Sequence, residues 1–250
     1  MEVRVLSCAL EIRNVSPHSL MDRTRASEVR GPGSIPGGGT RTIFLFTHAF
    51  FSYTYLMLYT RKGDSGTTKA FNSKPGQRIS KSSCQTEALG ALDELNSFIG
   101  LVKVKLSDLT WTAQISSDQS VDSTKKPAEI IQWVQECLFI IQAQVAGADK
   151  KIEQTKIDRI EYIVDWIEKE MPPIKTFFIS GGTELAALFD VSRTLARKAE
   201  RRVIAGTEHG EVVVDALTLT FLNRLSSLFY ALARYNNHKA GIVEQAPCYT

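Results

Sequence analysis

Three arginines and one glutamate lie on one side of a helical stretch in the last third of the chain. These residues, Arg193, Arg197, Glu200 and Arg201, are separated by steps of four, three and one. At roughly 100° per residue, they fall within an arc of about 100° on the helix surface. Guanidinium groups hold phosphate oxygens in a bidentate geometry, and a neighbouring carboxylate can orient one of them. The face could therefore bind a polyphosphate; a solvated face with charge pairs is the alternative interpretation.

Two glycine-containing segments could approach a ligand closely. In the first, residues 59–68, Gly63 and Gly66 let the backbone turn. The hydroxyl and cationic side chains around them are Thr60, Arg61, Lys62, Thr67 and Thr68. The second, residues 181–182, comes directly before the arginine-bearing helix, where free N–H groups attract anions. Neither segment has the spacing of a Walker loop. A β-turn explains the first segment equally well, and a plain helix start explains the second.

Two further polar sets lie on expected helices. Asp93 stands among leucines and either faces solvent or pairs with a cation of another helix. The second set shares one helix face at steps of four, three and four: Asn223, Ser227, Tyr230 and Arg234. Such side chains could hydrogen-bond a sugar or a base, or they could line a subunit interface.

The composition of the 250 residues excludes several classes of protein. A net charge of +3 argues against a dedicated nucleic-acid coat but allows a local anion site. The four cysteines and four histidines are scattered, with no Cys-x-x-Cys pair and no metal-ligand spacing. Neither a disulfide framework nor a metal site is therefore predicted.

Residues 1–58 differ in character from the remainder. The first 41 residues contain six arginines, no lysine and four acidic residues, whereas an organelle-targeting presequence is poor in acids. Residues 43–58 are aromatic and apolar but fall short of the ~20 residues that a membrane span needs. We interpret residues 1–58 as a leader or a poorly ordered extension, with a misassigned start as the alternative.

The elements that must position these side chains are helices. Apolar residues recur at three- and four-residue steps over Thr86–Leu106, Glu129–Ala148, Ile157–Glu170, Thr183–Ala205 and Val212–His238. Residues 107–126 break this pattern and are expected to form a loop, and no strand pattern is found after Thr86. The predicted fold is all-α, an up-and-down five-helix bundle of the ferritin-like kind over residues 86–240. Residues 59–85 would form a binding loop before it, and residues 241–250 a tail.

The combination and order of these motifs resemble the ATP:cob(I)alamin adenosyltransferases, the trimeric corrinoid adenosyltransferases. The matching segments are Tyr-Thr-Arg-x-Gly-Asp-x-Gly-x-Thr, Asp-Glu-Leu-Asn, Gly-Gly before Arg-Thr-x-x-Arg-x-Ala-Glu-Arg-Arg, and Leu-Asn-Arg-Leu-Ser. They extend from Tyr59 to near Tyr235. The arginine helix and the Tyr-Thr-Arg segment are the specific parts of the match.

This resemblance implies an enzyme that transfers the 5′-deoxyadenosyl group of ATP to cob(I)alamin and releases triphosphate. It implies a homotrimer with ATP and Mg²⁺ in clefts between subunits, and no resident metal site. The implied ATP-binding residues are Thr60, Arg61, Lys62, Gly63, Thr68, Lys69, Lys81, Arg197, Lys198, Ala199, Glu200, Arg201 and Asn223. Asp93 and Arg193 would form a salt bridge between subunits on the cobalamin side. Phe177 would help to displace the lower ligand of cobalt.

Partners and location are also implied by the resemblance. A cobalamin-dependent mutase and a cobalamin reductase are the candidate protein partners, and neither nucleic acid nor a membrane is expected. The mitochondrion, or otherwise the cytoplasm, is the expected location.

Several residues depart from the pattern that this family commonly has. Ile179–Ser180 stands in place of Leu-Pro, Asp190 in place of His, and Ser227 in place of Asp. Asp190 comes three residues before Arg193 and could compete with Asp93 for it. Two alternatives therefore stay open. One is a non-catalytic trimeric relative that delivers ATP or adenosylcobalamin to a partner enzyme, and the other is a helical scaffold whose basic face contacts acidic partners or RNA.

Overall fold

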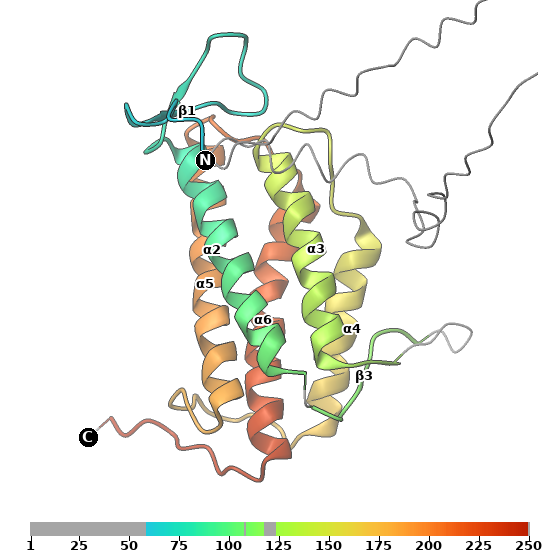
Figure 1. Cartoon of the computed structure of the whole chain (residues 1–250). Coiled ribbons are helices and arrows are strands. Elements are labelled where there is room, and N and C mark those ends of the chain that lie inside the picture. Colours follow the sequence, from blue (N-terminus) through green and yellow to red (C-terminus); the bar gives the residue numbers. More distant parts are fainter. Residues whose placement is uncertain (1–58, 108, 118–123, 250) are drawn as a thin grey trace, which may run out of the picture.

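The computed structural model describes residues 59–107, 109–117 and 124–249, and these form a bundle of five helices (Figure 1). The helices are α2 (Cys84–Lys105), α3 (Pro127–Val145), α4 (Gln154–Glu170), α5 (Glu184–Glu208) and α6 (Ala216–Lys239). They run alternately down and up the bundle, so the predicted all-α architecture is confirmed. None of these helices is long and apolar enough to cross a membrane. The segments predicted at residues 1–58 lie outside the described residues.

Capping side chains determine where three of the helices begin. Ser83, Thr183 and Asp215 each accept a hydrogen bond from the backbone N–H three residues ahead. The cap at Asp215 explains why α6 begins four residues later than the predicted start at Val212. Pro127 opens α3, a position where its missing N–H has no consequence.

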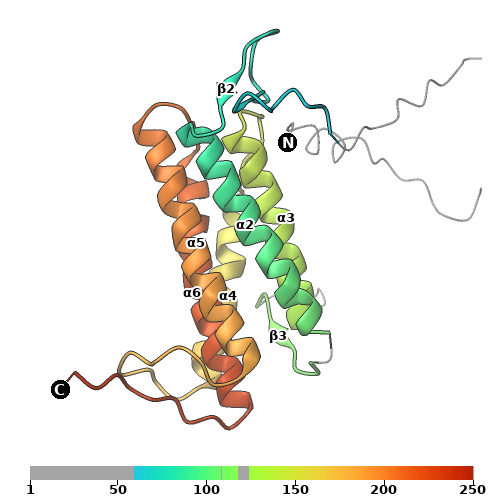
Figure 2. The ribbon, with the colours of Figure 1, turned by 60° about the vertical axis from the view of Figure 1, so that its left-hand side comes forward.

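Helix α6 is the centre of the packing. It packs against both α5 and α4, while α2 packs against α5 and α3, an arrangement seen from two sides in Figures 1 and 2. Nearly all of the side chains between Phe221 and Asn237 are buried or half-buried. Because the core takes up the inner faces of all five helices, the outer faces of α2 and α5 are left for a ligand.

Two short strand pairs close the loops at either end of α2. β1 (Thr67–Thr68) pairs with β2 (Ile79–Ser80) to form a hairpin above the bundle, and β3 (Ala113–Gln114) pairs with β4 (Thr124–Lys125). Arg78 braces the hairpin with hydrogen bonds to the side chain and carbonyl of Thr67, each 2.8 Å long. The prediction of a plain loop over residues 107–126 is corrected by β3 and β4. Strands of two residues carry no periodicity that a sequence pattern could reveal.

The turn before α5 requires glycine for two reasons. Gly182 has φ of +96°, a region that other residues rarely adopt. A Cβ atom at this position would lie 2.4 Å from Oδ1 of Asn237. Asn237 donates a hydrogen bond to the Gly181 carbonyl and accepts one from the N–H of Thr183. The side chain of α6 thus fills the space that a side chain at residue 182 would need.

We expect Gly182→Ala to lower the free energy of unfolding by about 2–4 kcal/mol, because it adds backbone strain and displaces Asn237. Denaturant titration measures this loss. Gly90→Ala is the matched control, since Gly90 lies within α2 with open space around it. That control should raise stability by about 0.5–1 kcal/mol. If both variants had the same stability, the role given to the Asn237 contact would be wrong.

The cysteines of the described residues are not paired in disulfides, as predicted. Cys137 is buried in the core of α3, and burial raises the pKa of its thiol to about 12. Such a thiol stays protonated and unreactive near neutral pH. Cys137 is therefore a packing residue and not a nucleophile.

Candidate functional site

A pocket of 590 Å³ lies beneath the β1–β2 hairpin, at the upper end of α2. Its lining is mainly apolar, with cations around it. The apolar side chains are Ala70, Ile79, Leu89, Ala91 and Phe139, and the cationic ones are Lys69, Lys81, Lys198 and Arg202. We call this space the hairpin pocket. An apolar hollow bordered by cations suits a ligand with a planar or sugar part and a phosphate part.

The hairpin loop brings together only some of its predicted binding residues. Thr68, Lys69 and Lys81 line the hairpin pocket, and Nζ of Lys81 would lie 3.0 Å from a Cβ atom at Gly63. Gly63 therefore leaves room for the Lys81 side chain to cross the loop. Thr60, Arg61 and Lys62 are exposed and do not line the pocket. The guanidinium of Arg61 instead lies over the ring of Tyr59.

Ion pairs link α2 and α5 at the floor of the hairpin pocket. Lys198 pairs with Glu94, and Arg202 pairs with Glu87 at 3.7 Å. All four side chains are more than two-fifths exposed, so these pairs contribute little stability and can open to a ligand. Asp93 is exposed beside them and also lines the pocket.

The arginine face of α5, which we define as Arg193, Arg197, Glu200 and Arg201, points away from the hairpin pocket and toward α6. Arg197 and Arg201 are exposed, and Glu200 accepts a hydrogen bond of 3.0 Å from Nδ2 of Asn223. Arg193 and Arg197 also line a groove of 320 Å³ between α4, α5 and α6. Asn223 and the arginine face, which are both predicted to bind ATP, thus lie next to each other.

Two members of the predicted ATP-binding set are located elsewhere. Lys198 follows Arg197 by one residue and is rotated by about 100° around α5, so it faces α2 and the hairpin pocket. Ala199 is fully buried in the core. Its methyl group has a packing role and cannot reach a ligand, which corrects the prediction that Ala199 contacts ATP.

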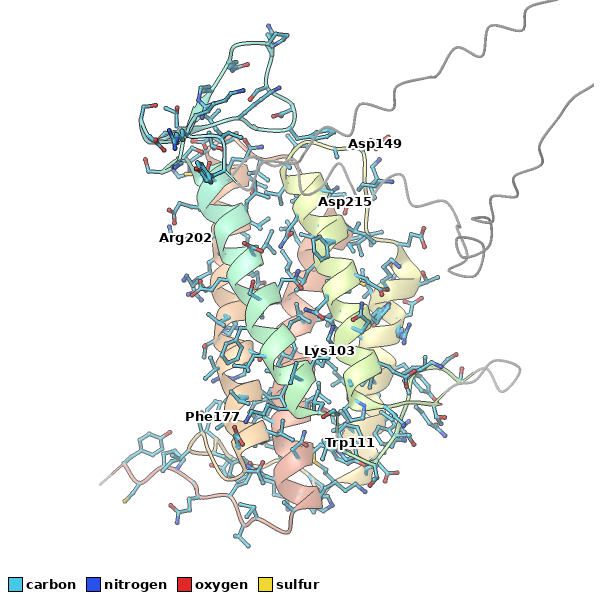
Figure 3. All side chains as sticks on the ribbon, in the orientation of Figure 1. Lys103, Trp111, Asp149, Phe177, Arg202 and Asp215 are labelled. Atoms are coloured by element: carbon cyan, nitrogen blue, oxygen red, sulfur yellow. The ribbon has the colours of Figure 1, made fainter. Side chains whose placement is uncertain are left out.

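The hairpin pocket and the arginine face are on different sides of the same chain. The pocket and the groove beside Arg197 have no lining residue in common. The hairpin pocket opens at the upper end between α2 and α5, near Arg202 in Figure 3, whereas the groove lies beyond the core on the α4 and α6 side. A single chain therefore keeps the hairpin pocket and the arginine face apart.

A third cavity, of 700 Å³, opens at the lower end of the bundle around Phe177. The Phe177 ring is 75% exposed, and Figure 3 shows it at the end opposite the hairpin. Arg193, Tyr230 and Tyr249 also line this cavity. The Phe177 ring would therefore be accessible to a ligand in this cavity. We call this space the Phe177 cavity.

Within the chain, Arg193 is paired with a residue other than Asp93. Its Nε lies 3.5 Å from Oδ1 of Asp190, while Asp93 is on the far side of α2 and exposed. Within one chain Arg193 thus contacts Asp190, the residue expected to compete with Asp93 for it. The predicted salt bridge of Arg193 with Asp93 concerns two copies of the chain and stays a prediction.

The polar face predicted on α6 divides into two parts. Asn223 and Ser227 are exposed, but Arg234 is buried and pairs with Asp190 at 2.8 Å and with Glu244 at 2.8 Å. The sequence pattern did not reveal this network. Glu244 lies beyond the last predicted helix, and helical spacing says nothing about a tail that folds back.

No group of three or more His, Cys, Asp or Glu side chains that could hold a metal ion is found among the described residues. A tightly held metal usually needs such a cluster. The carboxylate that accompanies the arginine face is Glu200.

Comparison with known proteins gives one consistent result. The family model described as "Cobalamin adenosyltransferase" matches residues 58–236. The Corrinoid adenosyltransferase of Bacillus subtilis is 34% identical over 187 residues, which cover 75% of this chain and 90% of the relative. The Corrinoid adenosyltransferase PduO of Citrobacter freundii is 32% identical over 74% of this chain, which spans about half the length of that relative (51%).

A solved structure is also similar to this chain. It is a variant of the PduO-type ATP:corrinoid adenosyltransferase from Lactobacillus reuteri, complexed with cobalamin and ATP. The two are 27% identical with a TM-score of 0.63, and the match covers 77% of this chain and 97% of the other.

Proposed function

Since the chain belongs to the cobalamin adenosyltransferase family, we propose that it transfers the 5′-deoxyadenosyl group of ATP to reduced cobalamin and releases triphosphate. The observation that supports this proposal is the arginine face, whose Glu200 accepts a hydrogen bond from Asn223 of α6. Cob(I)alamin is itself a strong nucleophile, so its cobalt would bond to C5′ as the C5′–O bond breaks. The protein then needs no general base, and its task is to position both reactants and stabilise the leaving group.

We further propose that each ATP-binding cleft is shared between two copies of the chain. The hairpin pocket of one copy would hold the nucleoside, and the arginine face of a second copy would hold the triphosphate. The separation of these half-sites within one chain supports this arrangement. The exposed Asp93 at the edge of the hairpin pocket would then meet Arg193 of the second copy, as expected for a trimer with closed symmetry.

The residues divide the work according to their chemistry. Arg197 and Arg201 would bind the triphosphate oxygens and stabilise the charge that develops as it leaves. The hairpin loop would close over the nucleotide through seven of its residues: Thr60, Arg61, Lys62, Gly63, Thr68, Lys69 and Lys81. Magnesium would arrive bound to phosphate oxygens, which suits a site with no metal-binding cluster among the described residues. It would neutralise charge on the triphosphate.

The corrinoid would bind at the Phe177 cavity. Two of the Lactobacillus reuteri structures carry substitutions, one at a phenylalanine and one at an arginine twenty residues further along the chain. Phe177 and Arg197 have the same separation in this sequence. That spacing supports equating Phe177 with the phenylalanine that is substituted in the cobalamin-bound structures.

The test is to mix the purified chain with chemically reduced cobalamin and magnesium-ATP and to follow the absorbance of adenosylcobalamin. We expect one triphosphate for each adenosylcobalamin formed, and no product when ATP is omitted. Binding of ATP without turnover would overturn the enzyme and favour the carrier alternative. A mutase or reductase partner and a mitochondrial location remain proposals that this assay does not address.

A further inference from the structure

A buried guanidinium joins three segments at the lower end of the bundle. Arg234 of α6 is only 2% exposed, and its Nη2 donates a hydrogen bond of 2.8 Å to Oδ2 of Asp190 in α5. Its Nε lies 2.8 Å from Oε1 of Glu244 in the tail, without the angle of a hydrogen bond, so this contact is ionic. The same guanidinium lies over the rings of Tyr230 and Phe178, 5.1 and 6.0 Å from their centres.

Asn237, one turn further along α6, links the same segments through hydrogen bonds. Its Nδ2 donates to the Gly181 carbonyl at 2.8 Å and to Oε1 of Glu244 at 2.7 Å. Its Oδ1 accepts from the N–H of Thr183 at 2.9 Å. Glu244 is thus held by both Arg234 and Asn237, although it belongs to a tail outside the bundle. We call Asp190, Arg234, Asn237 and Glu244 the clasp.

Two groups of the Phe177 cavity depend on the clasp. The loop that carries Phe177 is tied to the tail, because the N–H of Ile179 donates to the Gln245 carbonyl at 2.9 Å. Arg193 is oriented by the second oxygen of Asp190, Oδ1, at 3.5 Å. Two carboxylates and two guanidiniums therefore balance one another at this end of the molecule, three of the four being nearly buried.

We propose that Asp190 and Glu244 are positioning residues that act through Arg234 to hold the Phe177 loop and Arg193 in place for the corrinoid. The identity of the ligand in this inference rests on the proposed function, whereas the mechanical link between the clasp and the Phe177 loop does not. Removing either carboxylate leaves the buried guanidinium of Arg234 without one of its ionic partners. Because an unpaired buried charge is costly, the surrounding segments must move to pair or hydrate it. Both movable segments border the Phe177 cavity.

The effect should be confined to the corrinoid. Among the described residues, no member of the clasp lines the hairpin pocket, and the clasp reaches the arginine face through the Asp190–Arg193 contact and not at Arg197 or Arg201, to which we assign the triphosphate. A residue that only stabilised the fold would weaken the binding of both substrates alike. A positioning residue of this kind changes the KM for the corrinoid and leaves the KM for ATP unchanged.

The experiment uses the full chain with Glu244→Gln, which keeps the shape of the side chain and removes its charge. We expect hydrogen exchange at the N–H of Ile179 to be at least about tenfold faster. We also expect the KM for reduced cobalamin to rise about tenfold, with the KM for ATP within about twofold of the unchanged chain. Glu184→Gln is the control, since Glu184 begins α5 at the same end but pairs only with exposed Lys105.

The outcomes separate the two hypotheses. Unchanged exchange at Ile179, or equal changes in both KM values, would overturn the clasp. Faster exchange in a protein that forms no adenosylcobalamin even without substitution would support the mechanical link and refute the proposed function. Asp190→Asn provides a second variant acting from the opposite side of Arg234. If it leaves the KM for the corrinoid unchanged while remaining folded by circular dichroism, the role given to Asp190 is wrong.

Discussion

Replacing Arg197 by alanine is expected to lower kcat/KM for ATP by roughly two to three orders of magnitude, because a bidentate contact to the leaving triphosphate is lost. Arg197 is exposed and forms no ion pair with another described residue, so we expect the free energy of unfolding to change by less than about 0.5 kcal/mol. Steady-state rates of adenosylcobalamin formation, together with calorimetric titration of ATP, measure the two effects separately.

Two further variants test whether the effect comes from the guanidinium of Arg197. Arg197→Lys retains the charge but not the fork, and a Lactobacillus reuteri relative with an arginine-to-lysine substitution was solved in complex with ATP. We therefore expect this variant to bind ATP and to turn over slowly. Lys169→Ala removes one cation from the exposed face of α4 and should behave as the unchanged chain. An Arg197→Ala protein with full activity would show that the triphosphate binds elsewhere.

Replacing Phe177 by alanine is expected to reduce turnover at least tenfold, about 1.4 kcal/mol of barrier, while leaving the KM for ATP unchanged. Phe177 is three-quarters exposed and contributes little to the core, so truncating it should leave the free energy of unfolding unchanged. A change in turnover would then report on its contact with the ligand. The absorbance spectrum of bound, one-electron-reduced cobalamin should also differ, because the apolar ring no longer excludes the lower ligand from cobalt.

The control for Phe177 is another apolar side chain on the surface. Val213 is 84% exposed in the loop between α5 and α6, at the opposite end of the bundle. Val213→Ala should change neither the rate nor the spectrum. If Phe177→Ala had the same spectrum and rate as the unchanged chain, the cavity around it would not be the corrinoid site.

The helical core was predictable because its signal repeats many times along the chain. Each helix presents several buried residues at regular steps, so an error at one position does not remove the pattern. Boundaries were harder. The start of α6 depends on one capping residue, Asp215, and the apolar residues just before it imitate a helical start.

Sequence spacing predicted which residues of α5 share a face, but not how the candidate site residues divide between the hairpin pocket and the arginine face. Helical spacing correctly grouped Arg197, Glu200 and Arg201, and it also placed Lys198 at a different angle. The family motif nevertheless grouped Lys198 and Ala199 with the arginines as ATP-binding residues. A sequence motif lists consecutive residues, whereas a binding face of a helix contains residues three or four apart. Arg234 could not be predicted to form its ion pairs, because its partners Asp190 and Glu244 lie 44 and 10 residues away in sequence and helical spacing does not relate them.

The proposed cleft between two copies would also have a consequence for inheritance. A mutant with a damaged hairpin loop would disable only the cleft to which it lends that loop, and a mutant with a damaged arginine face would disable only the other. Two such alleles in one cell would assemble some clefts from undamaged halves. A recessive mutation in the hairpin loop and one in the arginine face would therefore complement each other, whereas two mutations in the same half of the cleft would not.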